Sequence, residues 1–236
     1  MIPALALFLS AAAQADDSPL WMRYCAISPD GQTIAFSYQG DIYTVPSSGG
    51  KARQLTTHPA HDTRPVWSPD GQRIAFASNR SGNFDVFLMN KEGGEPKRLT
   101  THSTNEYPTT FKDNGHILYL ANVLQDAKDI QFPGTRFMQV YEISTDGGRP
   151  DLYSSLYMEN IALSKDGSKL LYNDYKGYED PWRKHHQSSI TRDIWLCTLG
   201  KDRSFQKVTT FGGEDRNPVW ACLLYTSPSP RDPKTS

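Results

Sequence analysis

The stretch Ser68-Pro69-Asp70-Gly71, followed by Arg73-Ile74-Ala75-Phe76, decides the fold of this 236-residue chain because it recurs. An earlier copy reads Ser28-Pro29-Asp30-Gly31 and is followed by Thr33-Ile34-Ala35-Phe36. Looser copies begin at residues 112 and 164, so the four starts at 28, 68, 112 and 164 lie 40, 44 and 52 residues apart. These distances match one propeller blade with loops of growing length.

Each copy predicts four short strands. In Ser-Pro-Asp-Gly, proline presets the φ of a type I turn, the Ser and Asp side chains bond nearby backbone donors, and glycine takes a positive φ. An apolar strand precedes this hairpin turn and another follows it. We expect third strands, mostly led by Asp, at 41–45, 85–89, 140–143 and 193–196, and short polar edge strands at 53–56, 97–100 and 207–209.

Four antiparallel strands per copy, repeated radially, predict an all-β fold, a β-propeller. The alternative is a β-sandwich with coincidental turns, which gives no reason for a blade-sized period. The predicted four-stranded antiparallel blades lie near residues 20–60, 61–104, 105–156 and 157–216. A fifth is expected to start at 217, because Pro218-Val219-Trp220 repeats Pro65-Val66-Trp67.

The expected propeller, residues 16–221, is therefore an incomplete, open part of a larger ring. The Ser-Pro-Asp-Gly turn that should follow Trp220 does not appear. An open arc would expose two apolar radial faces, and we expect low solubility from it.

Both ends of the chain are predicted to lie outside the propeller. Residues 4–13 are apolar and small, and Ala13-Gln14-Ala15 fits a signal-peptidase site, so residues 1–15 are interpreted as a signal peptide that directs export to the periplasm or the exterior. A basic n-region is missing, and an ordinary apolar helix is the alternative. Residues 222–236 resemble a translated sequencing adapter and are interpreted as a non-native tail; a native Pro/Ser-rich linker is the alternative.

Composition argues against several classes of function. The 25 Lys and Arg residues balance 26 Asp and Glu, for a net charge of -1, so the cationic field that nucleic-acid binding needs is missing. No apolar run is long enough to span a bilayer. Three cysteines cannot all pair, and they form no CxxC or Cys/His spacing, so the fold should depend on its core rather than on disulfides.

A basic loop is the main binding candidate in the sequence. It lies in the insertion from Tyr175 to Arg192, and its residues could pair with the carboxylates of Glu179, Asp180 and Asp193 or with a peptide C-terminus. Structural salt bridges are the alternative. The candidate residues are Arg183, Lys184, His185, His186 and Arg192.

No catalytic, metal or cofactor site is predicted. Ser188, Ser189 and the adjacent histidines are crowded in sequence, but a triad needs groups that converge from separate elements, and no Gly-x-Ser-x-Gly occurs. His58 and His61 form an H-x-x-H without a third ligand, so no metal is expected.

Other conspicuous residues receive structural predictions. Trp67 and Trp220, with Phe111 in the same register, are expected in the core between blades. The acids that lead third strands, Asp41, Asp85 and Asp193, are expected to accept hydrogen bonds from backbone donors.

The Ser-Pro-Asp-Gly copies resemble the WD40-like repeat of TolB, of tricorn proteases and of some dipeptidyl peptidases. Segments 41–56 and 82–100, the run from Gly177 to Trp195, and segment 213–220 narrow the resemblance, and the part from Trp182 to Trp195 is the most specific. Together, residues 20–221 resemble the N-terminal propeller of exported tricorn-like serine peptidases of the S41 class. Cys25 stands where proline is expected, and Lys112-Asp113-Asn114-Gly115 lacks Ser-Pro; neither changes the interpretation.

The resemblance implies a longer protein that cleaves oligopeptides. Its parts would be a six-bladed propeller, a second propeller, a PDZ-like domain and a catalytic core whose Ser, His and Glu lie beyond residue 236. The propeller would guide or filter peptides, and its partners would be peptides, the missing blades and the downstream domains. Two alternatives stay open: a TolB-like periplasmic propeller that binds proteins without catalysis, and the propeller of a prolyl-oligopeptidase-type peptidase.

Overall fold

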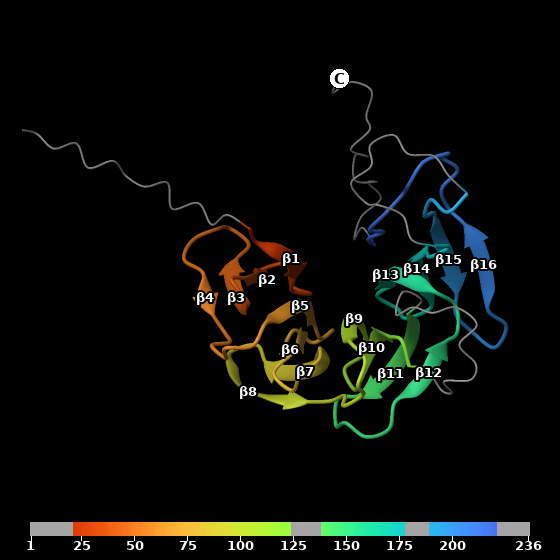
Figure 1. The fold of residues 1–236 in the computed structure, drawn as a ribbon. Coiled ribbons are helices and arrows are strands. Elements are labelled where there is room, and N and C mark those ends of the chain that lie inside the picture. The colour runs from red at the N-terminus through yellow and green to blue at the C-terminus, as the bar shows by residue number, and fades with distance from the viewer. Residues whose placement is uncertain (1–20, 124–137, 178–188, 221–236) are drawn as a thin grey trace, which may run out of the picture.

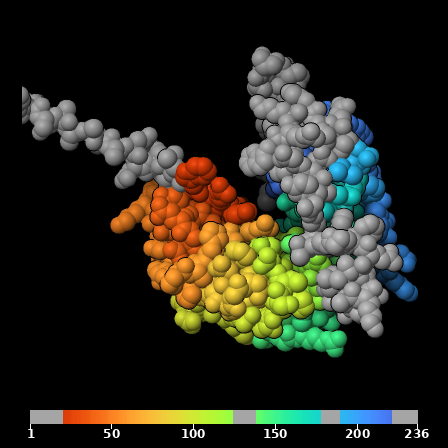
Figure 2. All heavy atoms as spheres, in the orientation of Figure 1, coloured from red at the N-terminus to blue at the C-terminus, as the bar shows by residue number. Residues whose placement is uncertain are grey.

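The computed structural model describes residues 21–123, 138–177 and 189–220. Their strands form four sheets, and each sheet contains four strands that are consecutive in sequence and antiparallel. The sheets follow one another along an arc, with the first strand of each sheet on the inside and the fourth on the outside (Figure 1). The first and fourth blades stand apart, as the space-filling view also shows (Figure 2). The all-β, four-bladed prediction is therefore confirmed.

The strands fall into four concentric sets. The inner strands are β1 (Arg23–Ile27), β5 (Asp62–Trp67), β9 (Glu106–Asp113) and β13 (Met158–Leu163). The second strands are β2 (Thr33–Tyr38), β6 (Arg73–Ser78), β10 (His116–Ala121) and β14 (Lys169–Asp174). The third strands are β3 (Asp41–Pro46), β7 (Asp85–Asn90), β11 (Gln139–Ser144) and β15 (Ile194–Thr198). The outer strands are β4 (Arg53–Gln54), β8 (Gly93–Arg98), β12 (Asp151–Ser154) and β16 (Ser204–Lys207).

The Ser-Pro-Asp-Gly turn is stabilised by its own side chains. The Ser68 hydroxyl donates to Asp70 Oδ1 at 2.5 Å and accepts from the N–H of Arg73 at 2.9 Å. Gly71 has a φ of 66°, a value that residues with a side chain rarely adopt. The hydrogen bond from Ser68, followed by one from the N–H of Gln72, lowers the pKa of Asp70. The turn predicted from the sequence is confirmed, and the copies at Ser28 and Ser164 make the same bonds.

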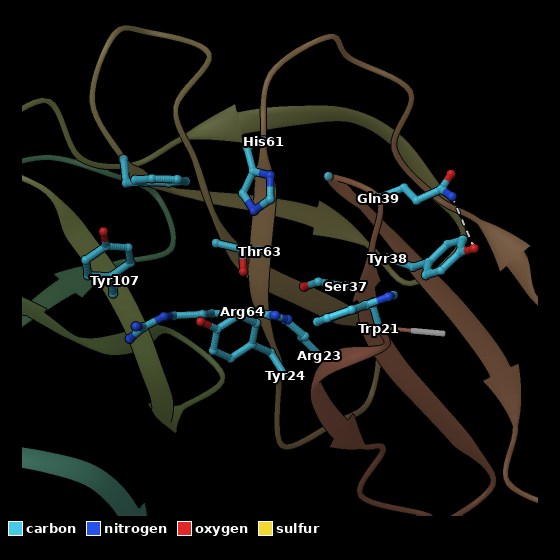
Figure 3. Close-up of a pocket in the computed structure, with 12 residues that line it drawn as sticks. Trp21, Arg23, Tyr24, Ser37, Tyr38, Gln39, His61, Thr63, Arg64 and Tyr107 are labelled. Atoms are coloured by element: carbon cyan, nitrogen blue, oxygen red, sulfur yellow. Dashed lines mark hydrogen bonds between the residues drawn. The ribbon is translucent and has the colours of Figure 1, made fainter. Parts of the chain in front are cut away.

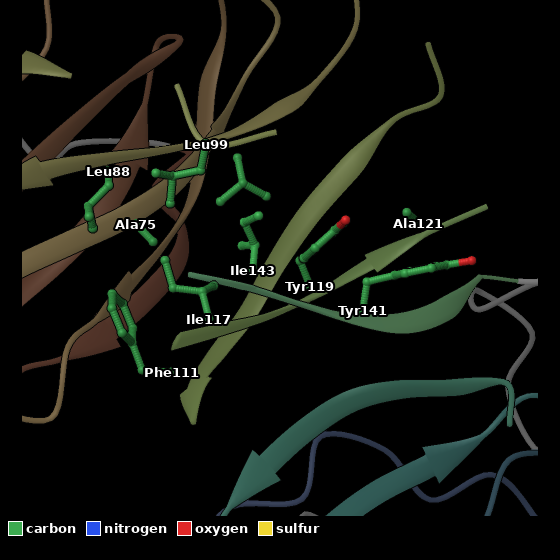
Figure 4. Packing of buried hydrophobic residues seen from close by; sticks show 10 residues of the cluster. Ala75, Leu88, Leu99, Phe111, Ile117, Tyr119, Ala121, Tyr141 and Ile143 are labelled. Carbon is green, nitrogen blue, oxygen red and sulfur yellow. The ribbon is translucent and has the colours of Figure 1, made fainter. Parts of the chain in front are cut away.

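The hydrophobic core lies between the blades. Each of three buried clusters takes its members from two adjacent sheets, and Figure 4 shows the one between the second and third blades. The cluster between the first two blades consists of Ala35, Ile42 and Leu55 with Ile74, Phe76, Phe87 and Met89. Trp67 packs against it and donates its indole N–H to Ala26 O at 3.0 Å across the interface, so its predicted place in the core is confirmed. Adjacent blades therefore stabilise one another.

The outer strands end earlier than the sequence predicts. The expected segment at 97–100 contains a Leu-Thr pair that lies beyond β8, because the Thr100 hydroxyl accepts the N–H of Val86 at 2.9 Å. The Thr56 hydroxyl accepts the N–H of Ile42 at 3.0 Å in the same way. A side chain thus replaces the backbone carbonyl at this point of each ladder, and the strand ends there.

The prediction for the acids that lead the third strands is wrong. Among the residues that the structure describes, their hydrogen-bond donors are side chains rather than backbone N–H groups. Asp41 accepts from the Thr56 hydroxyl at 3.0 Å. Asp85 pairs with Arg98 at 2.8 Å, and Asp193 pairs with Lys176 and Lys207 at 2.7 and 2.9 Å. The reason is that the backbone N–H after the acid is already bonded to a threonine hydroxyl.

Residues 215–220 contact the fourth blade as an inner strand contacts the blade before it. The N–H of Asp215 donates to Arg192 O at 2.9 Å, as the N–H of Asp62 donates to Gly40 O at 2.7 Å. The indole of Trp220 donates to Ala162 O at 2.9 Å, which repeats the bond from Trp67. Trp220 is 39% exposed, however, so its predicted place in the core is not borne out: no further blade among the described residues covers it. These contacts favour the prediction that another blade begins here.

Candidate functional site

A β-bulge interrupts the inner strands four residues before their turns. The pairing register shifts between Arg23 and Ala26 in β1, between Thr63 and Val66 in β5, and between Glu159 and Ala162 in β13. The bulged residues Tyr24, Arg64 and Asn160 have φ values of 53°, 55° and 49°. Few non-glycine residues adopt such a φ, and bulges commonly redirect a side chain near a functional site.

The bulged residues line a cavity of about 740 Å³ at the inside of the arc. All four inner strands contribute to it, and so does the segment after the fourth blade. We call this cavity the axial channel. Its wall includes Tyr24, Cys25, Arg64, Tyr107, Pro108, Glu159, Asn160 and Asn217.

A second cavity of about 400 Å³ adjoins the channel between the first three blades (Figure 3). Tyr24, Arg64 and Tyr107 line both cavities. We call the second one the arginine pocket. Its wall consists of Trp21, Arg23, Tyr24, Ser37, Tyr38, Gln39, Gly40, His61, Thr63, Arg64, Phe84 and Tyr107.

Aromatic rings enclose the Arg64 guanidinium. Its central carbon lies 5.2 Å from the centre of the Tyr24 ring and 4.3 Å from that of Tyr107. The Tyr107 ring in turn lies 5.5 Å from Phe84, and Phe84 lies 6.1 Å from His61. Burial raises the pKa of Tyr107, and the charge of Arg64 opposes that rise. The result is a cation held among rings at the junction of the two cavities.

Of the predicted basic loop, Arg192 lies within the described residues. Its side chain is 6% exposed and pairs with Glu159 at 2.9 Å and Glu214 at 2.7 Å. Its guanidinium also stacks 4.9 Å from the Tyr175 ring. For Arg192, these contacts are structural salt bridges, the alternative to peptide binding for the basic loop. Arg183, Lys184, His185 and His186 lie outside the described residues, so a binding role for the loop stays a prediction.

His58 and His61, for which no metal is expected, lie within the described residues. Within the three described segments, no group of three or more His, Cys, Asp or Glu residues could hold a metal ion. His61 packs against Phe84, and His58 accepts the N–H of Ala60 at 3.0 Å. The same segments contain no helix long and apolar enough to cross a membrane.

A buried acid lies beside the arginine pocket. Glu106 on β9 is 1% exposed and accepts the N–H of His102 at 3.3 Å. Burial raises the pKa of Glu106 to about 7; a hydrogen bond from Thr100 acts against the rise, and the charge of Asp85 adds to it. This carboxyl belongs to the interface between the second and third blades.

Glu106→Gln should remove part of the pH dependence of stability. The folded protein holds this proton more tightly than the unfolded chain, so its stabilising effect is complete below pH 4.5 and is lost as the pH rises towards 7. The variant should gain on the parent chain across that window, by up to about 3 kcal/mol. Urea unfolding at several pH values measures this. Glu95→Gln, at an exposed position, is the control, and parallel pH profiles for parent and Glu106→Gln would refute the assignment.

Arg64 and the bulges were not predicted from the sequence. A signal exists once the copies are aligned on their turns, because the position four residues before the serine holds Tyr24, Arg64 and Asn160. These residues share no chemistry, so the position does not look like part of the repeat.

The fold and the axial channel define a β-propeller module whose inner strands surround a ligand-sized space. The chain belongs to the family of the tricorn protease N-terminal β-propeller domain, whose sequence model matches residues 19–228.

Individual relatives match over shorter stretches. Tricorn protease homolog 1 of Streptomyces coelicolor is 34% identical over 71 residues, which are 30% of this chain and 6% of that protein. A TolB homolog of Chlorobium luteolum is 41% identical over 56 residues, 24% of this chain and 13% of the homolog. The chain thus spans a small part of these curated relatives.

A solved structure of the tricorn protease resembles the chain with a TM-score of 0.62 at 20% identity, over 82% of this chain and 18% of that one. At this identity the likeness shows the fold alone.

Proposed function

We propose that this chain is the N-terminal propeller of an exported tricorn-like serine peptidase that degrades oligopeptides, and that it guides or filters peptides through the axial channel. The catalytic groups of that peptidase would lie in a downstream domain. The observation that supports this role best is the channel, because all four inner strands contribute to its wall and three of them place a bulged residue there.

The channel wall suits an extended peptide. The volume of the channel, about 740 Å³, lies in the range of small-molecule ligand sites. Tyr24 offers a ring to side chains, whereas the Asn160 side-chain oxygen and the Asn217 amide can bond a peptide backbone. A wall of this kind accepts many sequences, as a guiding channel requires.

Further blades and domains would complete the peptidase beyond the four described blades. The contacts of Asp215 and Trp220 with the fourth blade support a further blade. The complete ring would have six blades. The nucleophilic Ser and its His and Glu partners would lie in a downstream core, preceded by a second propeller and a PDZ-like domain. Residues 1–15 would be a signal peptide for export to the periplasm or the exterior, and residues 222–236 a non-native tail.

A TolB-like protein-binding propeller without catalysis is the second candidate, favoured by the similarity to a TolB homolog. The gene sequence downstream separates the candidates. A PDZ-like region and a Ser-containing core support the peptidase, an end after the last blade supports the TolB-like protein, and a Gly-x-Ser-x-Gly domain would indicate a prolyl-oligopeptidase-type enzyme.

Blocking the channel tests the guiding role. Cys25 lines the channel and is exposed, whereas Cys197 is buried. In the longer protein, a bulky maleimide on Cys25 should slow hydrolysis of a long oligopeptide and leave a chromogenic dipeptide substrate unaffected. Cys25→Ser treated with the same reagent is the control. Equal hydrolysis of the long peptide before and after labelling would refute guidance through this channel.

A further inference from the structure

We propose that the arginine pocket binds the carboxylate of a peptide, with Arg64 as the group that recognises it and the surrounding rings holding an adjacent aromatic or apolar side chain. The proposal rests on the entry of peptides into the axial channel, to which this pocket adjoins. Figure 3 shows Arg64 and Arg23 among the rings.

The charge of the pocket wall favours an anionic ligand. Two arginines line the pocket, and its described wall contains no aspartate or glutamate. Arg64 makes no ion pair with the described residues, whereas five other arginines each pair with a carboxylate. Those five are Arg53, Arg80, Arg98, Arg192 and Arg216. A half-buried cation without a counterion favours an anionic ligand.

The Arg64 side chain is held in place before any ligand binds. The Tyr24 and Tyr107 rings contact the guanidinium at 5.2 and 4.3 Å, and the bulge fixes the backbone of Arg64 at a φ of 55°. Stacking on rings leaves the N–H groups at the edge of a guanidinium available, and these bind a carboxylate in a bidentate manner. Little conformational entropy remains to be lost on binding.

The wall beside the Arg64 guanidinium suits an apolar side chain next to a polar group. Tyr38, His61 and Phe84 supply a ring-lined surface for an apolar side chain. The hydroxyls of Ser37 and Thr63 lie buried in the same wall and have no hydrogen-bond partner among the described residues. Buried polar groups are ordinarily bonded, so this wall has capacity for a polar ligand.

The test measures the binding of three blocked tripeptides to the full chain by calorimetry. The probes are acetyl-Ala-Ala-Phe, its C-terminal amide, and acetyl-Ala-Glu-Phe amide. We expect the free acid to bind about tenfold or more tightly than its amide, since a charge-assisted bond is lost. The Glu-containing amide shows which carboxylate the pocket recognises. If it binds as tightly as the free acid, the pocket also accepts a side-chain carboxylate. If it binds as weakly as the plain amide, the pocket recognises the peptide C-terminus.

Arg64→Gln should abolish the preference for the free acid. Arg149→Gln, which removes the same charge at an exposed position, should keep it. Circular dichroism checks folding, and Arg64→Lys, which retains the charge but not the fork, should show an intermediate preference. In the parent chain the preference should weaken with added salt, which requires no variant.

Equal affinity for the free acid and the amides, absence of binding by all three probes, or an undiminished preference in folded Arg64→Gln would overturn the proposal. The guiding role is tested separately at Cys25. If blocking Cys25 slows peptide hydrolysis while acid and amide bind alike, the channel proposal stands and the carboxylate site fails.

Discussion

Phe76→Ala should lower the free energy of unfolding by about 3 to 5 kcal/mol. Phe76 is 0% exposed and lies in the cluster between the first and second blades. Its ring stacks 6.0 Å from that of Phe87, and the Arg80 guanidinium lies 5.7 Å from it. Removing the ring leaves a cavity that two separate sheets would have to close together, so little relaxation is expected. Urea denaturation followed by tryptophan fluorescence measures the loss.

Phe205→Ala is the matched control for this prediction. Phe205 lies on the outer strand β16 and is 43% exposed, so the same chemical change should cost less than about 1 kcal/mol. Similar losses for the two variants would mean that the interfaces between blades are not the main source of stability.

Arg192→Met should lower the free energy of unfolding by about 3 kcal/mol. Without the guanidinium, the carboxylates of Glu159 and Glu214 are left close together, and Glu214 is 17% exposed. Burial raises the pKa of Glu214, but the hydrogen bonds and charges of Arg216 and Arg192 outweigh that effect and lower it. Arg216 still pairs with Glu214 when Arg192 is replaced, so this acid stays charged. Adding Glu214→Gln to Arg192→Met should therefore recover part of the loss.

Arg192 also belongs to the predicted basic loop, so a control variant and a peptide-binding measurement are needed. Arg149→Met, at an exposed position, should change stability by less than about 0.5 kcal/mol. If Arg192→Met retains stability but loses peptide binding, then Arg192 contacts peptide as the loop prediction requires. If Arg192→Met is less stable but its folded form still binds peptide, then Arg192 has a structural role.

The blades could be predicted from the sequence because their determinants are local. Ser68, Asp70 and Gly71 lie within one turn, and the bonds that stabilise it join residues at most five positions apart. The second and third strands follow for the same reason, because their apolar residues are contiguous.

The site could not be predicted in the same way because it depends on contacts between blades. Arg64 meets Tyr24 and Tyr107, which are forty or more positions away in sequence, and no local pattern encodes that encounter. Arg192 likewise pairs with Glu159 and Glu214, whereas the sequence proposed its neighbour Asp193. The blade period places these strands side by side, but the bulge decides which side chains face the centre.

Hydrogen exchange with and without acetyl-Ala-Ala-Phe tests most directly whether ligands occupy the inside of the arc. The account predicts that bound peptide slows exchange in the inner strands β1, β5 and β9, around the bulged residues, and leaves the outer strands β4, β8 and β12 unchanged. Protection confined to the outer strands, or no protection under conditions where binding is measured, would contradict it.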